Sequence, residues 1–411
     1  MDNASEANEP YLVFHDVISS YQTPCLQYGT RKVILFFERD TAFAALSPRK
    51  KRKPILAIFL CSFNRSFNCF RKLFPRAQFS DIILKLQDRK AAVMKLQINL
   101  TDSVYDLERF SSSRELKDLL KGFDGIELMH LEDDPRGIIT DDMVVGYHMS
   151  QPEYWLDFWK GRMDLCAVEF DTPEKAAAYY KGSDPSALVR HVRSEYDYAV
   201  FRGAQYMVVH VSDAGAFEEI TGKYHYRSED VIKGFCDLMN EALPADEDGP
   251  LLLTENMWQP GLDFLEPALT ARLMENIKYP KKGIMLDTGH LMHTAPELKS
   301  QKEAVRYIHR RLDEHGDLCR YIRGVHLNQS VTGNIMKRYQ KHPPAPAATF
   351  EERTSQLFEY IFKMDLHRPF VGEGVKELVE RIDPDYMTFE FITSNLEEHR
   401  KKLQRQRKAL L

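Results

Sequence analysis

The stretch Gly283-Ile284-Met285-Leu286-Asp287-Thr288-Gly289-His290 joins a short apolar run to two polar side chains. The apolar part is typical of a buried strand; Asp287 follows it directly, and His290 comes three residues later. Carboxylate and imidazole are both metal-ligand groups, so a strand that ends in this way can present two of them at one place. A D-x-x-H string also arises by chance, and it gains meaning only where the pattern recurs along the chain.

The same alternation of apolar runs and longer amphipathic stretches continues from Met94 to the C-terminus. The candidate strands are Leu96–Leu100, Gly125–Met129, Val144–His148, Tyr206–His210, Leu251–Glu255, Gly283–Asp287, Gly324–Leu327 and Met387–Phe391. The candidate helices are Ser113–Lys121, Pro185–Arg202, Ser228–Ala242, Pro267–Asn276, Gln301–His315, Phe350–Phe362 and Val375–Ile382, and the charged segment Asn395–Leu411 is expected to form a solvated closing helix. Eight βα units in about 300 residues predict an α/β fold, the (β/α)8 TIM barrel, over residues 94–411. A doubly wound parallel sheet is the alternative.

Residues 1–93 differ in charge from the rest of the chain. They carry 15 Lys and Arg against 8 Asp and Glu, whereas residues 94–411 carry 41 against 53. The first segment is therefore interpreted as a basic N-terminal extension that binds nucleic acid or another partner. The alternatives are a poorly ordered leader and sequence upstream of a later true start at Met94. The acidic balance of the barrel disfavours duplex DNA as its partner, because duplex binding usually shows a basic footprint.

Composition and cysteine spacing indicate a globular protein of the cytoplasm. Hydrophobic residues make up 43% of the chain and charged residues 28%, as in soluble globular proteins. No apolar run is long enough to predict a membrane span, and no secretory signal is recognisable. The cysteines have no C-x-x-C spacing, so they are expected to be reduced thiols; they are Cys25, Cys61, Cys69, Cys166, Cys236 and Cys319.

Carboxylates and imidazoles end most of the candidate strands. They are His148, His210, Glu255, Asp287 with His290, His326, and Glu390. In a TIM barrel the C-terminal strand ends form the active face, so these side chains are expected to converge on one mouth. There they would repel or desolvate one another unless a divalent metal neutralised them. Each also has an ordinary structural interpretation, such as a hydrogen-bonded core histidine, a helix cap at Glu255-Asn256 or an ion pair of Glu390.

A family resemblance rests on motifs in the same order. They are Gly122-Phe123-Asp124-Gly125-Ile126-Glu127, Val-Val-His210, Thr-Glu255-Asn256, Leu-Asp287-Thr-Gly-His290, Arg323-Gly-Val-His326-Leu-Asn328 and Phe-Glu390-Phe. From about Met94 to Ile392 the chain resembles the xylose isomerase-like TIM-barrel superfamily. That superfamily includes sugar isomerases and epimerases as well as the apurinic/apyrimidinic endonuclease family 2, endonuclease IV.

The two branches imply different metal sites. The epimerase branch implies one Mn²⁺ or Mg²⁺ ion held by Glu255, Asp287, His326 and Glu390, with the two glutamates as acid and base and His290 on the sugar. The endonuclease branch implies up to three Zn²⁺ ions. Its ligands would be His148, His210 and Glu255 for one ion, Glu255, Asp287, His326 and Glu390 for the second, and His290, Asp365 and His367 for the third, with Gly372-Glu373-Gly374 following.

Two insertions depart from the endonuclease pattern. There are 38 residues between His326 and Asp365, including a basic patch at Lys337–Lys341, and the aromatic segment Tyr154–Trp159 follows His148. Loops over a barrel mouth set substrate choice, so the DNA substrate is not carried over with the ligands. The sequence thus favours zinc-dependent phosphoester hydrolysis of a small phosphorylated substrate or an abasic nucleic acid. A sugar or sugar-phosphate isomerase or epimerase and a non-catalytic ligand-binding barrel are the alternatives.

Overall fold

The computed structural model describes Leu12–Val13, Phe36–Phe37 and residues 93–411 except 246. The chain divides into two units, Met1–Lys90 and Ala91–Leu411. In the first unit, strand β1 (Leu12–Val13) pairs antiparallel with β2 (Phe36–Phe37). Most of the predicted basic extension over residues 1–93 lies outside the described residues.

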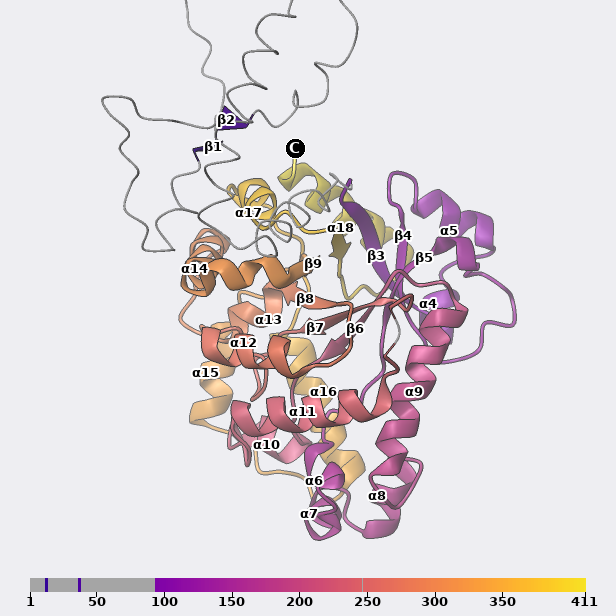
Figure 1. The fold of residues 1–411 in the computed structure, drawn as a ribbon, viewed down its shortest axis with the longest axis vertical. Helices are drawn as coiled ribbons and strands as arrows, with labels where there is room; N and C mark the ends of the chain where they lie inside the picture. Colours follow the sequence, from indigo (N-terminus) through magenta and orange to yellow (C-terminus); the bar gives the residue numbers. More distant parts are fainter. Residues whose placement is uncertain (1–11, 14–35, 38–92, 246) are drawn as a thin grey trace, which may run out of the picture. The chain divides into compact units, whose positions relative to one another are not determined.

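The second unit is a closed barrel of eight parallel strands, in the order β10-β3-β4-β5-β6-β7-β8-β9. The strands are β3 (Lys95–Thr101), β4 (Gly125–Met129), β5 (Val144–His148), β6 (Tyr206–His210), β7 (Leu251–Glu255), β8 (Lys282–Asp287), β9 (Ile322–His326) and β10 (Tyr386–Phe389). Figure 1 shows these strands surrounded by helices. The predicted (β/α)8 TIM barrel is confirmed.

Four strands have the predicted bounds, and the last two are shifted. Strand β9 begins at Ile322 instead of Gly324, because Ile322 already pairs with Ile284 of β8; the exposed Arg323 lies at a shift of the register, and Gly324 pairs with Met285. Strand β10 ends at Phe389, where its pairing with β3 ends, so Glu390 lies just beyond the strand instead of within it.

Seven helices that cover the barrel follow the predicted ranges closely. They are α5 (Ser113–Leu119), α9 (Ser186–Phe201), α11 (Ser228–Ala242), α12 (Pro267–Asn276), α14 (Gln301–His315), α17 (Val375–Ile382) and α18 (Leu396–Ala409); the short helix α4 (Val104–Leu107) was not predicted. Pro267 occupies the first turn of α12 as predicted, whereas Pro185 is the residue before α9. The closing helix α18 is charged outside and buries His399, Leu403 and Gln406. None of the described helices is both long and apolar enough to cross a membrane.

The barrel interior is filled by large side chains from neighbouring strands. Val145, Tyr206, Val208, Leu251, Leu253 and Met285 form one buried cluster, distinct from the larger core. Tyr206 extends furthest, because its hydroxyl contacts Gln97 on β3, Glu127 on β4 and Thr388 on β10. The interior is therefore a packed floor beneath the C-terminal mouth, as in other barrels of this type.

Two insertions at the C-terminal strand ends pack on each other. After β5 come α6 (Leu156–Trp159), α7 (Met163–Glu169) and α8 (Pro173–Tyr179); after β9 come α15 (Gly333–Lys341) and α16 (Phe350–Met364). Helix α10 (Ala216–Thr221) after β6 packs against α15 and α16, and these elements gather at one end of the barrel (Figure 1). The aromatic segment Tyr154–Trp159 is largely buried, and the basic patch Lys337–Lys341, expected in a loop, is helical because Gly333–Lys341 forms α15.

Arg353 fastens the two insertions together. Its guanidinium donates to the carbonyl oxygen of Glu169 at 2.6 Å and to Asp171 Oδ1 at 2.7 Å, and also to the carbonyl oxygens of Ala347 and Ala348. The residue is only 6% exposed, so no water replaces these contacts easily. Phe170 and Phe350 add an aromatic contact, with ring centroids 4.8 Å apart.

Arg353→Ala should therefore destabilise the protein by about 2 kcal/mol or more, because it leaves buried acceptors without a donor. Urea unfolding measures the change. Lys363→Ala on the same helix is the control, since it breaks only an exposed pair with Glu359 and should cost less than about 0.5 kcal/mol. Equal effects of the two substitutions would contradict the fastening role of Arg353.

Candidate metal centre

The structure brings the nine candidate ligand residues together at the C-terminal mouth of the barrel. They form three groups, in each of which the possible ligand atoms lie within 4.8 Å of one another. The groups are His148, His210 and Glu255; Glu255, Asp287, His326 and Glu390; and His290, Asp365 and His367. They have the same members as the three ligand groups that the resemblance to the endonuclease branch implies.

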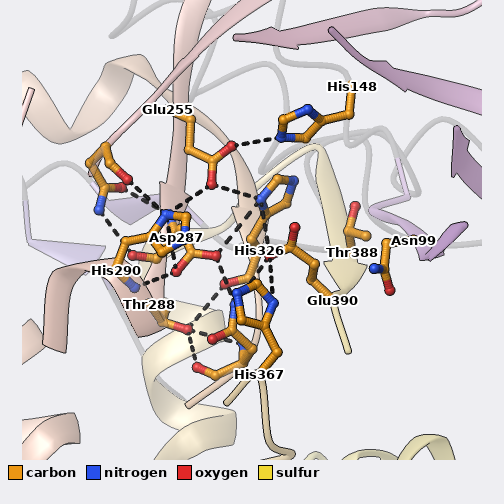
Figure 2. Close-up of polar contacts among 12 residues, drawn as sticks. Asn99, His148, Glu255, Asp287, Thr288, His290, His326, His367, Thr388 and Glu390 are labelled. Carbon is orange, nitrogen blue, oxygen red and sulfur yellow. Dashed lines mark hydrogen bonds and ion pairs between the residues drawn. The ribbon is translucent and has the colours of Figure 1, made fainter. Parts of the chain in front are cut away.

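Glu255 lies at the centre of the cluster, at the C-terminal end of β7, with no exposed surface. Its Oε2 is 3.2 Å from His148 Nε2 and 3.6 Å from His210 Nε2. Its Oε1 is 3.1 Å from His326 Nδ1 and 3.2 Å from His290 Nδ1. One carboxylate thus faces members of all three groups, and Figure 2 shows its contacts with His148 and His326.

The Asp-Thr-Gly-His segment is a strand end followed by a helix. Asp287 ends β8 and is the N-cap of α13 (Thr288–His293), where its Oδ1 accepts the main-chain N–H of His290 at 2.6 Å. Gly289 is needed because a Cβ there would lie 1.9 Å from Asn328 Oδ1. This close approach lets Asn328 Nδ2 donate to Asp287 Oδ2 at 2.7 Å and to Glu390 Oε2 at 3.2 Å.

The third group forms in the loop after α16. His367 has a φ of +40°, a left-handed conformation that is unusual for a residue with a Cβ. The conformation is held by Ser330, whose hydroxyl oxygen accepts the main-chain N–H groups of Leu366 and His367. Backbone strain of this kind persists where the surroundings fix it, and it often accompanies a functional site.

The two carboxylate oxygens of Asp365 have different partners. Its Oδ1 lies 3.0 Å from both Ser330 Oγ and His293 Nε2. Its Oδ2 lies 2.7 Å from His367 Nε2 and 3.5 Å from His290 Nε2. The first oxygen thus fixes the orientation in which the second faces the two imidazoles.

Sequence reasoning missed several residues around the cluster. His293 is a buried supporting residue, and the signal for it was its place one helical turn after His290. Trp258 packs its ring at 5.1 Å from His290 and 5.0 Å from His293, measured between ring centroids. Glu127 belongs to a fourth group of possible ligands with His148 and His326; a carboxylate in the middle of an apolar strand was its signal.

The spacing of the ligand atoms fits a divalent metal. Two ligand atoms at about 2.1 Å from one tetrahedral zinc ion lie about 3.4 Å apart. In the second group, His326 Nδ1 lies 3.1 Å from Glu255 Oε1, 3.8 Å from Asp287 Oδ2 and 3.5 Å from Glu390 Oε2. The first group has separations of 3.2 and 3.6 Å from Glu255 Oε2. Nitrogen and carboxylate oxygen donors of this kind suit Zn²⁺, and the carboxylate-rich second group also suits Mn²⁺.

Main-chain carbonyls orient two of the imidazoles. His148 Nδ1 lies 3.2 Å from the carbonyl oxygen of Met149, and His290 Nδ1 lies 3.1 Å from that of Asn256. A carbonyl oxygen only accepts, so each Nδ1 carries a proton and each Nε2 is free toward the cluster. Such outer contacts are typical of metal-binding histidines.

The charges of the cluster are strongly coupled. Burial, with the nearby carboxylates of Glu390 and Glu255, raises the pKa of Asp287 to about 7. Burial by itself lowers the pKa of His367, but the negative charges of Asp365 and Glu390 raise it to about 9. In the same way, against the effect of burial, neighbouring carboxylates raise the pKa of His326 well above its usual value. Without a metal, protonated imidazoles therefore balance the buried carboxylates.

Two side chains of the cluster are partly exposed. Seven of its residues are buried, whereas the side chain of His210 is 21% exposed and that of Glu390 is 13% exposed. Trp258 packs against His290, and its Nε1 donates to Glu219 at 2.8 Å. His210 and Glu390 are therefore the members of the cluster that an incoming ligand can contact most readily.

Fold and site define a TIM barrel with a His and carboxylate cluster in its mouth. The family described as Xylose isomerase-like TIM barrel matches residues 115–406, so the chain belongs to that family. No curated protein sequence matches the chain.

Several solved structures have a similar fold. The crystal structure of AsfvAP:AG is 13% identical, with 77% of this chain and 98% of that chain covered and a TM-score of 0.43. An L-ribulose 3-epimerase is 15% identical, with 75% and 86% covered and a TM-score of 0.38. The 3-keto-D-glucoside 4-epimerase YcjR from E. coli is 12% identical, with 77% and 99% covered and a TM-score of 0.36. At such identities and scores these likenesses carry no information on activity.

Metal uptake by the metal-free protein should release protons, because His367 with a pKa of about 9 and Asp287 with a pKa of about 7 hold theirs near neutral pH. Protons compete with the metal for the same atoms, so the apparent Zn²⁺ affinity should rise from about pH 6 to about pH 9. Calorimetric titration in buffers of different ionisation enthalpy measures the number released. A result of zero protons at about pH 7, or affinity that falls with rising pH, would contradict this charge balance.

Proposed function

We propose that the chain is a zinc-dependent phosphoester hydrolase whose active site is the cluster in the barrel mouth. The observation that carries this proposal is the third group, His290, Asp365 and His367. A one-metal isomerase needs only the four residues around His326, and it gives no reason for a buried His-Asp-His group beside them. A three-metal site needs all nine residues.

Each group would hold one ion. Glu255 would serve the first two ions through its two oxygens, and Asp365 would serve the third through Oδ2, which faces His290 and His367. Ions held in this way lower the pKa of bound water toward neutrality and stabilise the charge that develops on a phosphoryl group.

The chain's own residues supply position and access. Asn328 holds Asp287 and Glu390 in place through two hydrogen bonds from one amide nitrogen. Glu390 is partly exposed, so a bound substrate can contact its carboxylate. His290 is buried beneath Trp258, where a role as a metal ligand suits it better than direct contact with substrate.

A small phosphoester fits this mouth better than duplex DNA. The insertions α6–α8 and α15–α16, joined by Arg353, stand on the C-terminal side of the barrel. Residues 94–411 carry 41 basic against 53 acidic residues, so the barrel offers a duplex no overall excess of positive charge. Of the nine residues, only His210 and Glu390 are not fully buried, so little of the cluster is open to a large ligand.

A sugar or sugar-phosphate isomerase or epimerase is the second candidate. One observation favours it: Glu255, Asp287, His326 and Glu390 form a complete four-ligand group by themselves. Glu255 and Glu390 lie on the same side of His326, with Oε1 and Oε2 at 3.1 and 3.5 Å from Nδ1, where two carboxylates can act as base and acid on one substrate. In that case His290 contacts the sugar, and one Mn²⁺ or Mg²⁺ ion suffices.

Metal content and activity separate the two functions. The wild-type protein should contain about three zinc ions per chain, and His148→Ala and His367→Ala should each lose about one. Hydrolysis of a chromogenic phosphodiester should fall roughly 100-fold or more in each variant, since a catalytic metal contributes several kcal/mol. Elemental analysis and a colorimetric assay measure the two quantities.

His225→Ala is the control, because His225 lies outside all four ligand groups and is exposed. It should keep the full metal content and activity. A wild-type protein with a single Mn²⁺ or Mg²⁺, and full activity of both cluster variants on a sugar substrate, would establish the second candidate and exclude the first. Faster cleavage of a duplex that carries an abasic site than of the small phosphodiester would contradict the proposed substrate class.

A further inference from the structure

Glu127 is a buried carboxylate that the nine candidate ligands do not include. It is the middle residue of β4 and is 2% exposed. Its side chain points into the barrel, where it reaches His326 on β9 and Thr388 on β10. Burying an ionised carboxylate costs free energy unless hydrogen bonds and a positive charge compensate it.

Three donors surround the Glu127 carboxylate. Tyr206 Oη donates to Oε2 at 2.6 Å, and Thr388 Oγ1 donates to the same oxygen at 3.0 Å. His326 Nε2 lies 2.9 Å from Oε1 and 3.1 Å from Oε2. Gln97 Nε2 in turn donates to Tyr206 Oη at 2.7 Å, so the phenol proton is directed at Glu127.

The ring of His326 is therefore held at both nitrogens. Nε2 faces Glu127, and Nδ1 faces Glu255, Asp287 and Glu390, the other three members of the second group. An ionised carboxylate only accepts, so Nε2 keeps a proton for Glu127. With an ion in the second group, Nδ1 would then be the nitrogen whose lone pair binds it. This rests on the proposed metal site: we infer that Glu127 is a positioning residue that fixes His326 as an Nδ1 ligand and increases its basicity.

The alternative is that Glu127, His148 and His326 hold an ion of their own. The contacts of Glu127 and of His148 disfavour an ion at this place. Both oxygens of Glu127 already lie at hydrogen-bonding distance from a protein donor, and an ion there would require His326 Nε2 to lose the proton that bridges to Glu127. The Nε2 of His148 is also turned to Glu255 at 3.2 Å, toward the first group.

The chain makes room for this contact at a specific position. Gly146 on β5 has no side chain, and a Cβ there would lie 2.4 Å from Tyr206 Oη and 2.1 Å from its ring. The Tyr206 side chain can cross the interior to Glu127 only because this space is empty. Glu127 also differs from the supports of His148 and His290, which are main-chain carbonyls without charge.

The experiment compares zinc binding by the full chain and by Glu127→Gln, Glu127→Ala and Tyr206→Phe. Removal of an outer partner of a metal-binding histidine typically weakens metal affinity by about 10–100-fold. We expect a loss of that size in Glu127→Ala, a smaller loss in Glu127→Gln and Tyr206→Phe, and the wild-type number of ions in all variants at saturating zinc. Tyr147→Phe is the matched control, because Tyr147 is also fully buried and donates to a glutamate, Glu195 Oε2, at 2.9 Å, away from the cluster.

NMR of the ¹⁵N-histidine-labelled, zinc-loaded protein supplies a readout that a merely structural role would not change. His326 should show a metal-bound Nδ1 and a protonated Nε2 whose proton exchanges slowly, and exchange should become fast in Glu127→Ala but not in Tyr147→Phe. One ion fewer at saturation in the Glu127 variants would overturn the inference in favour of a ligand role, and unchanged zinc affinity would overturn it altogether. A wild-type chain that binds no zinc would instead refute the proposed function, so the two failures are distinguishable.

Discussion

The carboxylate of Glu255 is the charge on which the organisation of the mouth depends. It has no exposed surface, and the imidazoles of four histidines surround it at 3.1 to 3.6 Å. Burial raises the energy of such a charge, but the nearby histidines lower the pKa of Glu255 well below its usual range. The carboxylate is therefore ionised, and cations must compensate it, either as protons on the imidazoles or as metal ions in their place. Either form of compensation requires the histidines to stay where they are.

The barrel delivers these residues by its register. His210 at the end of β6 pairs with Glu255 at the end of β7, and Asp287 at the end of β8 pairs with His326 at the end of β9. Neighbouring parallel strands lie about 4.8 Å apart, so residues at paired positions are brought within reach of a common ion without any further folding. Loops then add only what the strands cannot supply, namely His290 through the cap of α13 and His367 through the strained turn after α16.

This division explains what the sequence could predict. Strand ends such as His148 and Glu255 follow apolar runs directly, so their place at the mouth can be derived from local pattern and the fold class. Asp365 and His367 lie in a loop without such a run, and only the resemblance to a family indicated them. Their contacts with Ser330 and His293 join segments 35 and 72 residues apart, and no local pattern encodes such contacts. The role of Glu127 could not be predicted for a related reason. It lies within an apolar strand, and the side chain that it contacts, His326, is 199 residues away in the sequence.

The insertions cover one part of the cluster and leave other parts exposed. Met336, Tyr360 and Met364 from the second insertion form a small core with Trp258, which covers the third group. That side is therefore closed by apolar packing, and the remaining openings are at His210 and Glu390. Glu153, which precedes the aromatic segment, comes within 3.8 Å of His210 and brings a partly exposed carboxylate to the approach. An anionic substrate would meet this charge together with Glu390, and its binding would depend on positive charge supplied by the ions behind them. Selectivity for phosphoesters would then come from the metals, and selectivity for size from the two insertions that Arg353 holds together.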